Sequence, residues 1–227
     1  MEKKHLGTHK IHQKCRSCRR LDRALRRARK RQRHLAASLV LASHSPRRRR
    51  LLRRAGFLLE VAMAEIEEIA SPHLSLRELT IANASRKART IAHERMDAVV
   101  LAADTLVALD GEIIGKPRHL EEAREILRRL SDRVHDVCTG VSIISGPHRK
   151  FVSFAEISRV RFRKLNERSI NNYLRKVNPL DKAGGYAAQR AGGEIITSIE
   201  GSFSNVMGLP MEPTIEALAQ FGIYPRR

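Results

Sequence analysis

Hydrophobic runs of strand length alternate with helical patterns over most of the chain. Residues 38–42 (SLVLA) form a short apolar run, and 98–103 (AVVLAA) has the unbroken apolar pattern of a central strand that is covered on both faces. Two longer β-rich segments, 135–146 and 150–165, predict an antiparallel pair of strands. A tight hairpin at Asp110 and Gly111 and further strands within 57–68 and 194–201 complete the pattern.

Helical patterns with recognisable ends lie between these strands. Ser45 before Pro46 is typical of an N-cap and a first helical turn, and Gly56 marks the end of that helix. The segment 76–96 is amphipathic, because its apolar residues recur near helical spacing. Further helices are expected at 119–133 and 166–176 and from about residue 211. The sequence therefore predicts an α/β fold in which helices cover a mixed sheet.

Positive charge is concentrated at the N-terminal end of the chain. The 44 lysines and arginines exceed the 24 acidic residues, which gives a net charge of +20. Residues 1–36 contain 14 of these cations and two acids, so they carry +12 of that total. We expect this basic extension to be disordered or partly helical, and residues 38–227 to form the folded domain. Contact with RNA, a targeting leader and a start-site artefact are alternatives for the extension.

Cysteine use and apolar stretches limit the class of protein. Cys15, Cys18 and Cys138 are an odd number and widely split, which excludes a disulfide framework and favours a reducing compartment. Histidines precede Cys15 and raise zinc as an alternative, but a standard finger places its histidines after the cysteines. No stretch reaches the ~20 apolar residues of a transmembrane helix. We therefore expect a cytoplasmic protein without a transmembrane segment.

An acidic residue follows the most apolar strand. Asp104 comes directly after residues 98–103, and we expect it at the carboxyl end of that strand. A carboxylate there is costly unless it is hydrogen-bonded, protonated or facing a site. Open α/β sheets bind ligands just outside their strand ends. Asp104 is therefore the main candidate for a functional residue, and the alternative is an aspartate that caps a turn.

Cations recur in the segments around this acid. Arg47 and Arg48 open a predicted helix, and the N-terminal end of a helix favours anions. Lys87 lies in a helical segment, Lys116 in GKP and Lys182 in DKAG. Cations that hold phosphates, beside an acid that positions or deprotonates water, are the groups of phosphoryl chemistry. The GKP segment lacks the pattern of a P-loop.

Several motifs in order resemble one family, the Maf nucleotide pyrophosphatases. They are LVLASHSPRRRRLL, EIEE, SRKA, AADTLVALDGEIIGKP, LRRLSDRVHDVCTGVSI, PLDKAGGYAAQ and IEGSFSNVMGLP, and they run from about residue 38 to the C-terminus. The resemblance implies a mixed sheet with flanking helices in two lobes around a nucleotide cleft, as in inosine triphosphatases. It also implies hydrolysis of nucleoside triphosphates to the monophosphate and pyrophosphate, with Mg²⁺ or Mn²⁺ as the divalent cation.

The resemblance assigns roles to residues that match the family motifs. Asp104 would be the proton acceptor, and Glu68 and Asp104 would hold the metal. Arg49 and Arg50 would be solvated, because the family needs two arginines after the proline. The substrate-binding residues would be Ser43, Arg47, Arg48, Glu68, Lys87 and Lys116.

Three positions mark the substrate branches of the family. Arg47, Thr105 and Gln189 are similar to the branch that acts on dTTP and UTP, whereas the 7-methyl-GTP branch carries Trp, Gln and Glu. A glutamine amide can both donate to and accept from a pyrimidine edge. The usual GAYGIQG reads GGYAAQR here, so Arg190 stands beside Gln189 in place of glycine. A preference for 7-methyl-GTP is therefore an alternative.

The expected partners follow from these assignments. They are dTTP and UTP, weak nucleic-acid contact through the basic extension, and a second copy of the chain in a homodimer. The competing hypothesis is a nucleic-acid-binding protein whose basic extension binds phosphates without sequence preference. A pair of Asp181 and Lys182 is as plausible a structural feature as it is a ligand pair.

Overall fold

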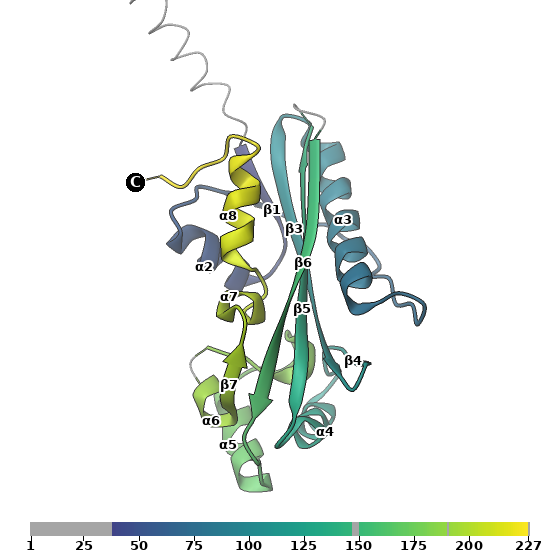
Figure 1. The fold of residues 1–227 in the computed structure, drawn as a ribbon, viewed down its shortest axis with the longest axis vertical. Coiled ribbons are helices and arrows are strands. Elements are labelled where there is room, and N and C mark those ends of the chain that lie inside the picture. The colour runs from purple at the N-terminus through teal and green to yellow at the C-terminus, as the bar shows by residue number, and fades with distance from the viewer. Residues whose placement is uncertain (1–37, 147–149, 190, 227) are drawn as a thin grey trace, which may run out of the picture. The chain divides into compact units, whose positions relative to one another are not determined.

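The computed structural model describes residues 38–146, 150–189 and 191–226. The predictions for the extension 1–36, with its alternative zinc site, and for Arg190 fall outside these described residues. Within them, a seven-stranded mixed sheet runs through the molecule (Figure 1). Its strands are β1 (Ser38–Ala42), β2 (Glu60–Ala62), β3 (Ala98–Leu109), β4 (Glu112–Ile114), β5 (Val134–Ser145), β6 (Lys150–Phe162) and β7 (Ile196–Glu200).

The order of the strands confirms a mixed sheet. It runs β2-β1-β3-β5-β6-β7, and β4 pairs with β3. β1 is parallel to β2 and β3, whereas β3, β5, β6 and β7 are antiparallel neighbours, so the expected antiparallel pair is β5 and β6. Asp110 and Gly111 have φ angles of 52° and 82°, and they form the predicted two-residue turn between β3 and β4.

The predicted helices are all present, and local side chains cap several of them. Ser45 accepts a hydrogen bond from the Arg48 amide, and Asn166 caps the helix at 167–176 in the same way. No helix in the described ranges is long and apolar enough to cross a bilayer. The helical segments are α2 (Pro46–Arg54), α3 (Leu76–Glu94), α4 (Leu120–Leu130), α5 (Glu167–Lys176), the 3₁₀ segment η1 (Ala183–Gly185), α6 (Gly192–Ile195), α7 (Phe203–Val206) and α8 (Met211–Ala219).

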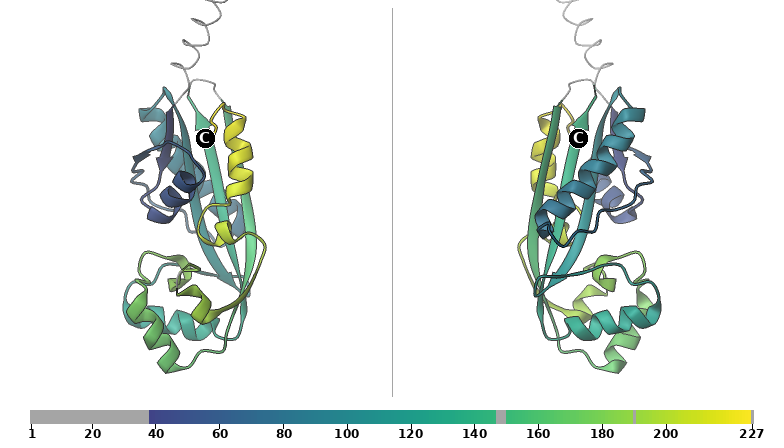
Figure 2. Two further views of the ribbon diagram at one scale, coloured as in Figure 1. Left: turned by 90° about the vertical axis from the view of Figure 1, so that its left-hand side faces the viewer. Right: turned by 90° about the vertical axis from the view of Figure 1, so that its right-hand side faces the viewer.

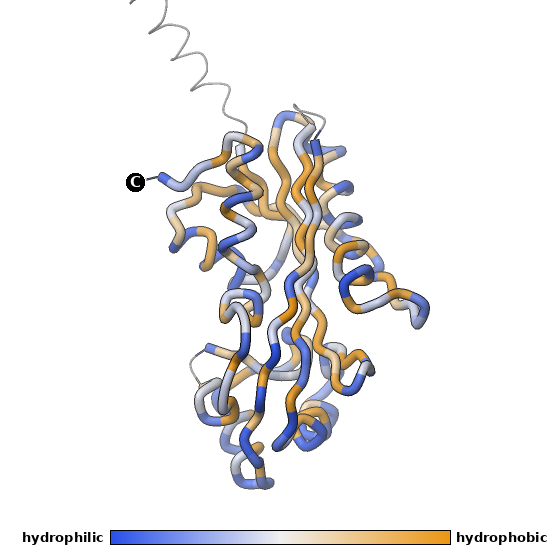
Figure 3. The backbone as a smooth tube through the Cα atoms, in the orientation of Figure 1, coloured by the Kyte–Doolittle hydropathy of each residue, from blue (hydrophilic) through white to orange (hydrophobic). Residues whose placement is uncertain are grey.

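Two lobes share the long strands β3, β5 and β6 (Figure 2). In one lobe, Leu101 of β3 packs with Leu52 of α2 on one face, and Ile91 of α3 packs on the opposite face. In the other lobe, Val107 of β3 shares a core with Tyr173 of α5. Figure 3 shows the hydrophobic stretches along the central strands, with hydrophilic stretches on the outer helices and loops. Helices thus flank a sheet that continues from one lobe to the other.

The prediction that a strand ends at Asp104 is wrong. β3 continues to Leu109, and Asp104 pairs with Gly140 of β5 in the middle of the ladder. The parallel neighbour β1 pairs with β3 only as far as Leu101 of β3. Beyond that residue one edge of β3 has no β1 beside it, so Asp104 can face a cavity although its own strand does not end.

Shorter elements also differ from expectation. β2 has only three residues, and the acidic stretch after it is a loop that contains Glu68. β7 begins at Ile196, because the residues before it form the short helix α6. Neither α6 nor α7 is predicted from the sequence, since four residues are too few to show a helical period.

Candidate active site

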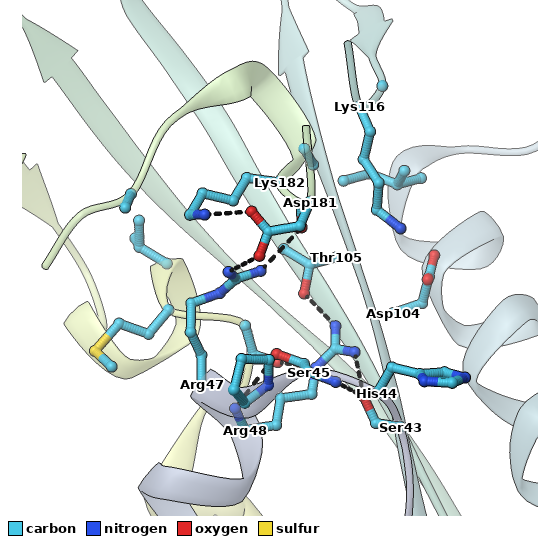
Figure 4. Close-up of a pocket in the computed structure, with 18 of the residues that line it drawn as sticks. Ser43, His44, Ser45, Arg47, Arg48, Asp104, Thr105, Lys116, Asp181 and Lys182 are labelled. Carbon is cyan, nitrogen blue, oxygen red and sulfur yellow. Dashed lines mark hydrogen bonds and ion pairs between the residues drawn. The ribbon is translucent and has the colours of Figure 1, made fainter. Parts of the chain in front are cut away.

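A cavity of about 630 Å³ is lined by residues of both lobes (Figure 4). It brings together residues from the β1–α2 connection and the start of α2, the loop after β2, α3, β3, the loop after β4, the segments on either side of η1, and the end of α7. Each residue predicted for the site lines this cavity: Ser43, Arg47, Arg48, Glu68, Lys87, Asp104, Thr105, Lys116 and Gln189. His44, which the sequence does not single out, lines it as well.

Two carboxylates meet at one ammonium group. Lys87 Nζ lies 2.6 Å from Asp104 Oδ1 and 2.5 Å from Glu68 Oε1. Asp104 is only 5% exposed, so this ion pair offsets the cost of burying its charge. Burial acts to raise the pKa of Glu68, but the hydrogen bond and charge of Lys87, with the charge of Lys116, hold that pKa below its ordinary value. The arrangement keeps an acceptor oxygen beside cations.

Asn83 does not line the cavity, but it contacts Asp104, and the sequence analysis missed it. Its Nδ2 lies 3.4 Å from Asp104 Oδ2 and 3.2 Å from the carbonyl of Ile69, while its Oδ1 accepts from the Ile69 amide at 2.7 Å. It therefore fixes the loop directly after Glu68. A signal was available, because Asn83 precedes Lys87 by four residues and lies on the same helix face.

Arg48 is held by the protein on several sides. Its Nε donates to the carbonyl of Gly208 at 2.7 Å, Nη1 to Ser43 Oγ at 3.0 Å and Nη2 to Thr105 Oγ1 at 2.9 Å. Three of its five N–H donors are thus used, and two remain for a ligand. Burial lowers the pKa of Arg48 to about 10, and the charge of Arg47 acts in the same direction, whereas Asp104 opposes it.

Arg47 reaches across the cavity to the opposite lobe. Its Nη1 donates to Asp181 Oδ2 at 3.0 Å and its Nη2 to the Asp181 carbonyl at 3.2 Å. Asp181 also pairs with Lys182, which in turn donates to the carbonyl of Asn178 at 2.7 Å. Burial acts to raise the pKa of Asp181, but Lys182 and Arg47 lower it overall. The pair thus holds its own loop and contacts Arg47, while its role as a ligand pair stays a prediction.

Lys116 and Gln189 approach from the second lobe. Figure 4 shows the Lys116 side chain directed toward Asp104. The segment before Gln189 is held by two tyrosines: Tyr173 Oη accepts from the Ala187 amide at 2.8 Å, and Tyr186 Oη lies 2.7 Å from His135 Nε2. Gln189 is half-buried at the cavity wall. A side-chain amide is therefore available on the opposite lobe from Arg47 and Arg48.

Buried acid, arginines and lysines in one cavity have the chemistry of an enzyme site for phosphate anhydrides. A family model described as "Maf-like protein" matches residues 38–221. The chain belongs to the Maf family, and it is accordingly a nucleotide pyrophosphatase, a hydrolase.

Relatives from three bacteria align with this chain over nearly their whole length. A protein of Akkermansia muciniphila is 42% identical over 184 residues, which are 81% of this chain and 96% of that protein. The chain is also similar to proteins of Symbiobacterium thermophilum (44%, covering 82% of this chain and 95% of that one) and Bacillus cereus strain G9842 (40%, 82% and 96%). Each of the three is named dTTP/UTP pyrophosphatase.

A solved structure gives a much weaker likeness. The Ham1 protein of Staphylococcus aureus is 19% identical, with a TM-score of 0.39 over 55% of this chain and 71% of that one. A likeness of this size carries no argument about function.

Proposed function

We propose that this protein hydrolyses dTTP and UTP to the nucleoside monophosphate and pyrophosphate. The observation that carries the proposal is the buried Asp104 carboxylate, which lies among Arg47, Arg48, Lys87 and Lys116 in one cavity. The relatives at 40–44% identity support the choice of base, because they are named for these two nucleotides. One water is consumed as the anhydride bond between the α and β phosphates breaks.

The cations bind the triphosphate and stabilise the charge that develops during the reaction. Arg47 and Arg48 stand at the N-terminal turn of α2, and Lys116 faces them from the other lobe. Preorganised donors of this kind stabilise a transition state because they need no reorganisation as charge moves. Asp104 accepts the proton of the attacking water, and Lys87 keeps its carboxylate oriented.

The oxygen donors fit a divalent cation of the magnesium type. Glu68 Oε1 and Asp104 Oδ1 both contact the ammonium of Lys87, so a divalent cation held beside that lysine would use the second oxygen of each carboxylate. Among the described residues no group of three or more His, Cys, Asp and Glu could hold a metal by itself. Mg²⁺ is usually held by one or two carboxylates together with substrate phosphates, which these two residues would supply. Such a cation would neutralise phosphate charge.

Gln189 and Thr105 are proposed to set the preference for dTTP and UTP. A site built to hydrogen-bond one base edge leaves buried polar groups unpaired when another base enters, and this discriminates strongly. Substituting Gln189→Glu removes the amide donor. We expect it to lower activity on dTTP and UTP and to shift preference toward a base that presents donors, such as guanine.

The test is pyrophosphate release from dTTP, UTP, CTP, GTP and 7-methyl-GTP with Mg²⁺ or Mn²⁺. kcat/KM is compared between the parent and Gln189→Glu for each nucleotide. A parent that prefers 7-methyl-GTP, or a profile that the substitution leaves unmoved, would refute the substrate assignment. A parent that releases pyrophosphate from none of the five would refute the proposed reaction itself.

A further inference from the structure

A chain of hydrogen bonds leads from α7 to the arginine in the cavity. Thr139 Oγ1 on β5 donates to the carbonyl of Asn205 at 3.1 Å. Thr105 Oγ1 lies 3.0 Å from Thr139 Oγ1, and Arg48 Nη2 donates to Thr105 Oγ1 at 2.9 Å. Thr139 is fully buried and does not line the cavity. It therefore cannot touch a ligand in this structure.

The direction of each bond in this chain is fixed by proton counting. A carbonyl oxygen only accepts, so the single hydroxyl proton of Thr139 is used on Asn205. Thr139 must then accept in its bond with Thr105, and Thr105 must donate. The proton of Thr105 is thereby used up inside the protein. Its oxygen is left as an acceptor, which is what a guanidinium N–H of Arg48 requires.

The far end of the chain is itself anchored in the core. Asn205 is fully buried, and its Nδ2 donates to the carbonyl of Val137 at 3.0 Å and to Ser158 Oγ at 2.9 Å. The same segment provides the carbonyl of Gly208, which accepts from Arg48 Nε at 2.7 Å. The residues around α7 thus hold Arg48 by two routes, one direct and one through Thr139.

We propose that Thr139 is a positioning residue for phosphate binding, which acts by fixing Thr105 as an acceptor and so orienting Arg48. This inference rests on the proposed function for its substrate. With Thr139 replaced by valine, the Thr105 proton has no acceptor on β5, and the hydroxyl is no longer held in one orientation. The support that Thr105 gives Arg48 is then weaker, and the free donors of Arg48 are aimed less well at the phosphates.

The experiment compares Thr139→Val with Thr139→Ser in the full chain. We measure kcat/KM for dTTP, the affinity for inorganic pyrophosphate by calorimetry, and Tm. Thr139→Val should lower both kcat/KM and pyrophosphate affinity by about 5- to 10-fold, the upper part of the range for a hydrogen bond between neutral groups. Thr139→Ser keeps the hydroxyl, and it should stay within about threefold of the parent.

The matched control is Thr214→Val in α8. Thr214 is also fully buried, and its hydroxyl donates to the carbonyl of Pro210 at 2.6 Å, but it does not line the cavity. The Thr214→Val substitution should lower Tm and leave pyrophosphate affinity unchanged. If Thr139→Val behaved like this control, with lower Tm and unchanged affinity, Thr139 would be merely structural and the proposal would be overturned.

A double-mutant cycle tests the route through Arg48. In an Arg48→Lys background, Thr139→Val should cost less than about threefold, because residues in one network are not additive. Full additivity would overturn the proposal. If Thr139→Val does not fold, Thr139→Ala removes the same hydroxyl and must give the same loss of pyrophosphate affinity.

The two proposals fail in different ways. A parent that binds pyrophosphate but hydrolyses no nucleotide would refute the proposed function, and the pyrophosphate arm would still decide the role of Thr139. A parent that neither binds pyrophosphate nor hydrolyses nucleotides would overturn both.

Discussion

The environment of Asp104 predicts a loss of turnover without a loss of fold. In Asp104→Asn, the amide keeps the shape of the side chain, but it can neither accept a proton nor balance the charge of Lys87. We expect kcat to fall by about 10²–10⁴-fold, as is typical when a general base is removed. Pyrophosphate release measures the loss, and circular dichroism with Tm checks the fold. A variant with near-parental kcat would show that Asp104 serves only the structure.

His135 predicts a pH dependence of stability. Burial lowers its pKa from 6.5 to about 4. Between these values the unfolded chain binds a proton that the folded protein does not, so the free energy of unfolding falls as pH falls from 6.5 to 4. The loss from this residue is about 3 kcal/mol, and it is absent above pH ~6.5.

Urea unfolding of the parent and His135→Phe at several pH values measures this contribution. The variant loses the bond to Tyr186, so it should be less stable at pH 7. Its stability should nevertheless fall less steeply below pH ~6.5, because the titrating group is gone. Parallel curves for the two proteins would contradict the assignment.

At the scale of a single element, α2 separates site arginines from solvent arginines. Arg47 bonds to Asp181 across the cavity, whereas Arg50 is exposed and makes no ion pair with the described residues. Arg47→Ala should lower kcat/KM by an amount equal to ~2.7–4 kcal/mol of transition-state stabilisation, about 10²–10³-fold. Arg50→Ala is the matched control on the same helix and should stay within about twofold. Equal damage from both would favour a diffuse surface for polyanions.

The packing of α3 on β5 predicts that a side chain added at Gly140 lowers both stability and activity. Gly140 pairs with Asp104, and a Cβ added to it would lie 2.3 Å from the backbone carbon of Thr80 in α3. Gly140→Ala must therefore push α3 away from the sheet, together with Asn83 and Lys87. We expect about 1–3 kcal/mol of destabilisation from overpacking and a marked fall in kcat. Unfolding and pyrophosphate release measure the two effects, and unchanged kcat would show that α3 can shift without moving Lys87.

The same strands show how far the sequence could predict the fold. Apolar runs and caps were enough to locate β1, β5, β6 and the longer helices, because periodicity reports local burial. They could not show that β3 continues past Asp104, since a buried carboxylate reads as a break in an apolar pattern. That position depends on where β1 ends beside β3, and strand pairing is a property of the folded sheet.

At the scale of the whole molecule, the residues of the site could be predicted but their contacts could not. Family motifs identify Arg47, Glu68 and Lys87, and the fold brings them to one cavity. Their contacts join segments far apart in the chain: Asp181 bonds to Arg47, and Asn83 bonds to the loop directly after Glu68. Thr139 lies in an ordinary strand pattern, so nothing local indicates that its proton is needed on Asn205.

The basic extension and the folded domain predict two separable activities. The family match covers residues 38–221, and the relatives align over 95–96% of their own length with 81–82% of this chain. Removing residues 1–36 should therefore leave kcat/KM for dTTP within about twofold of the parent.

The removed segment carries 14 lysines and arginines against two acids, so binding to single-stranded RNA should weaken sharply. Since each phosphate that the protein neutralises contributes about −0.7 to the slope of log K against log salt, this slope should also become shallower. Pyrophosphate release and RNA binding at several salt concentrations, on the full chain and the shortened one, measure both effects. Loss of dTTP turnover would tie the extension to catalysis, and unchanged RNA binding would show that the folded domain carries the polyanion surface.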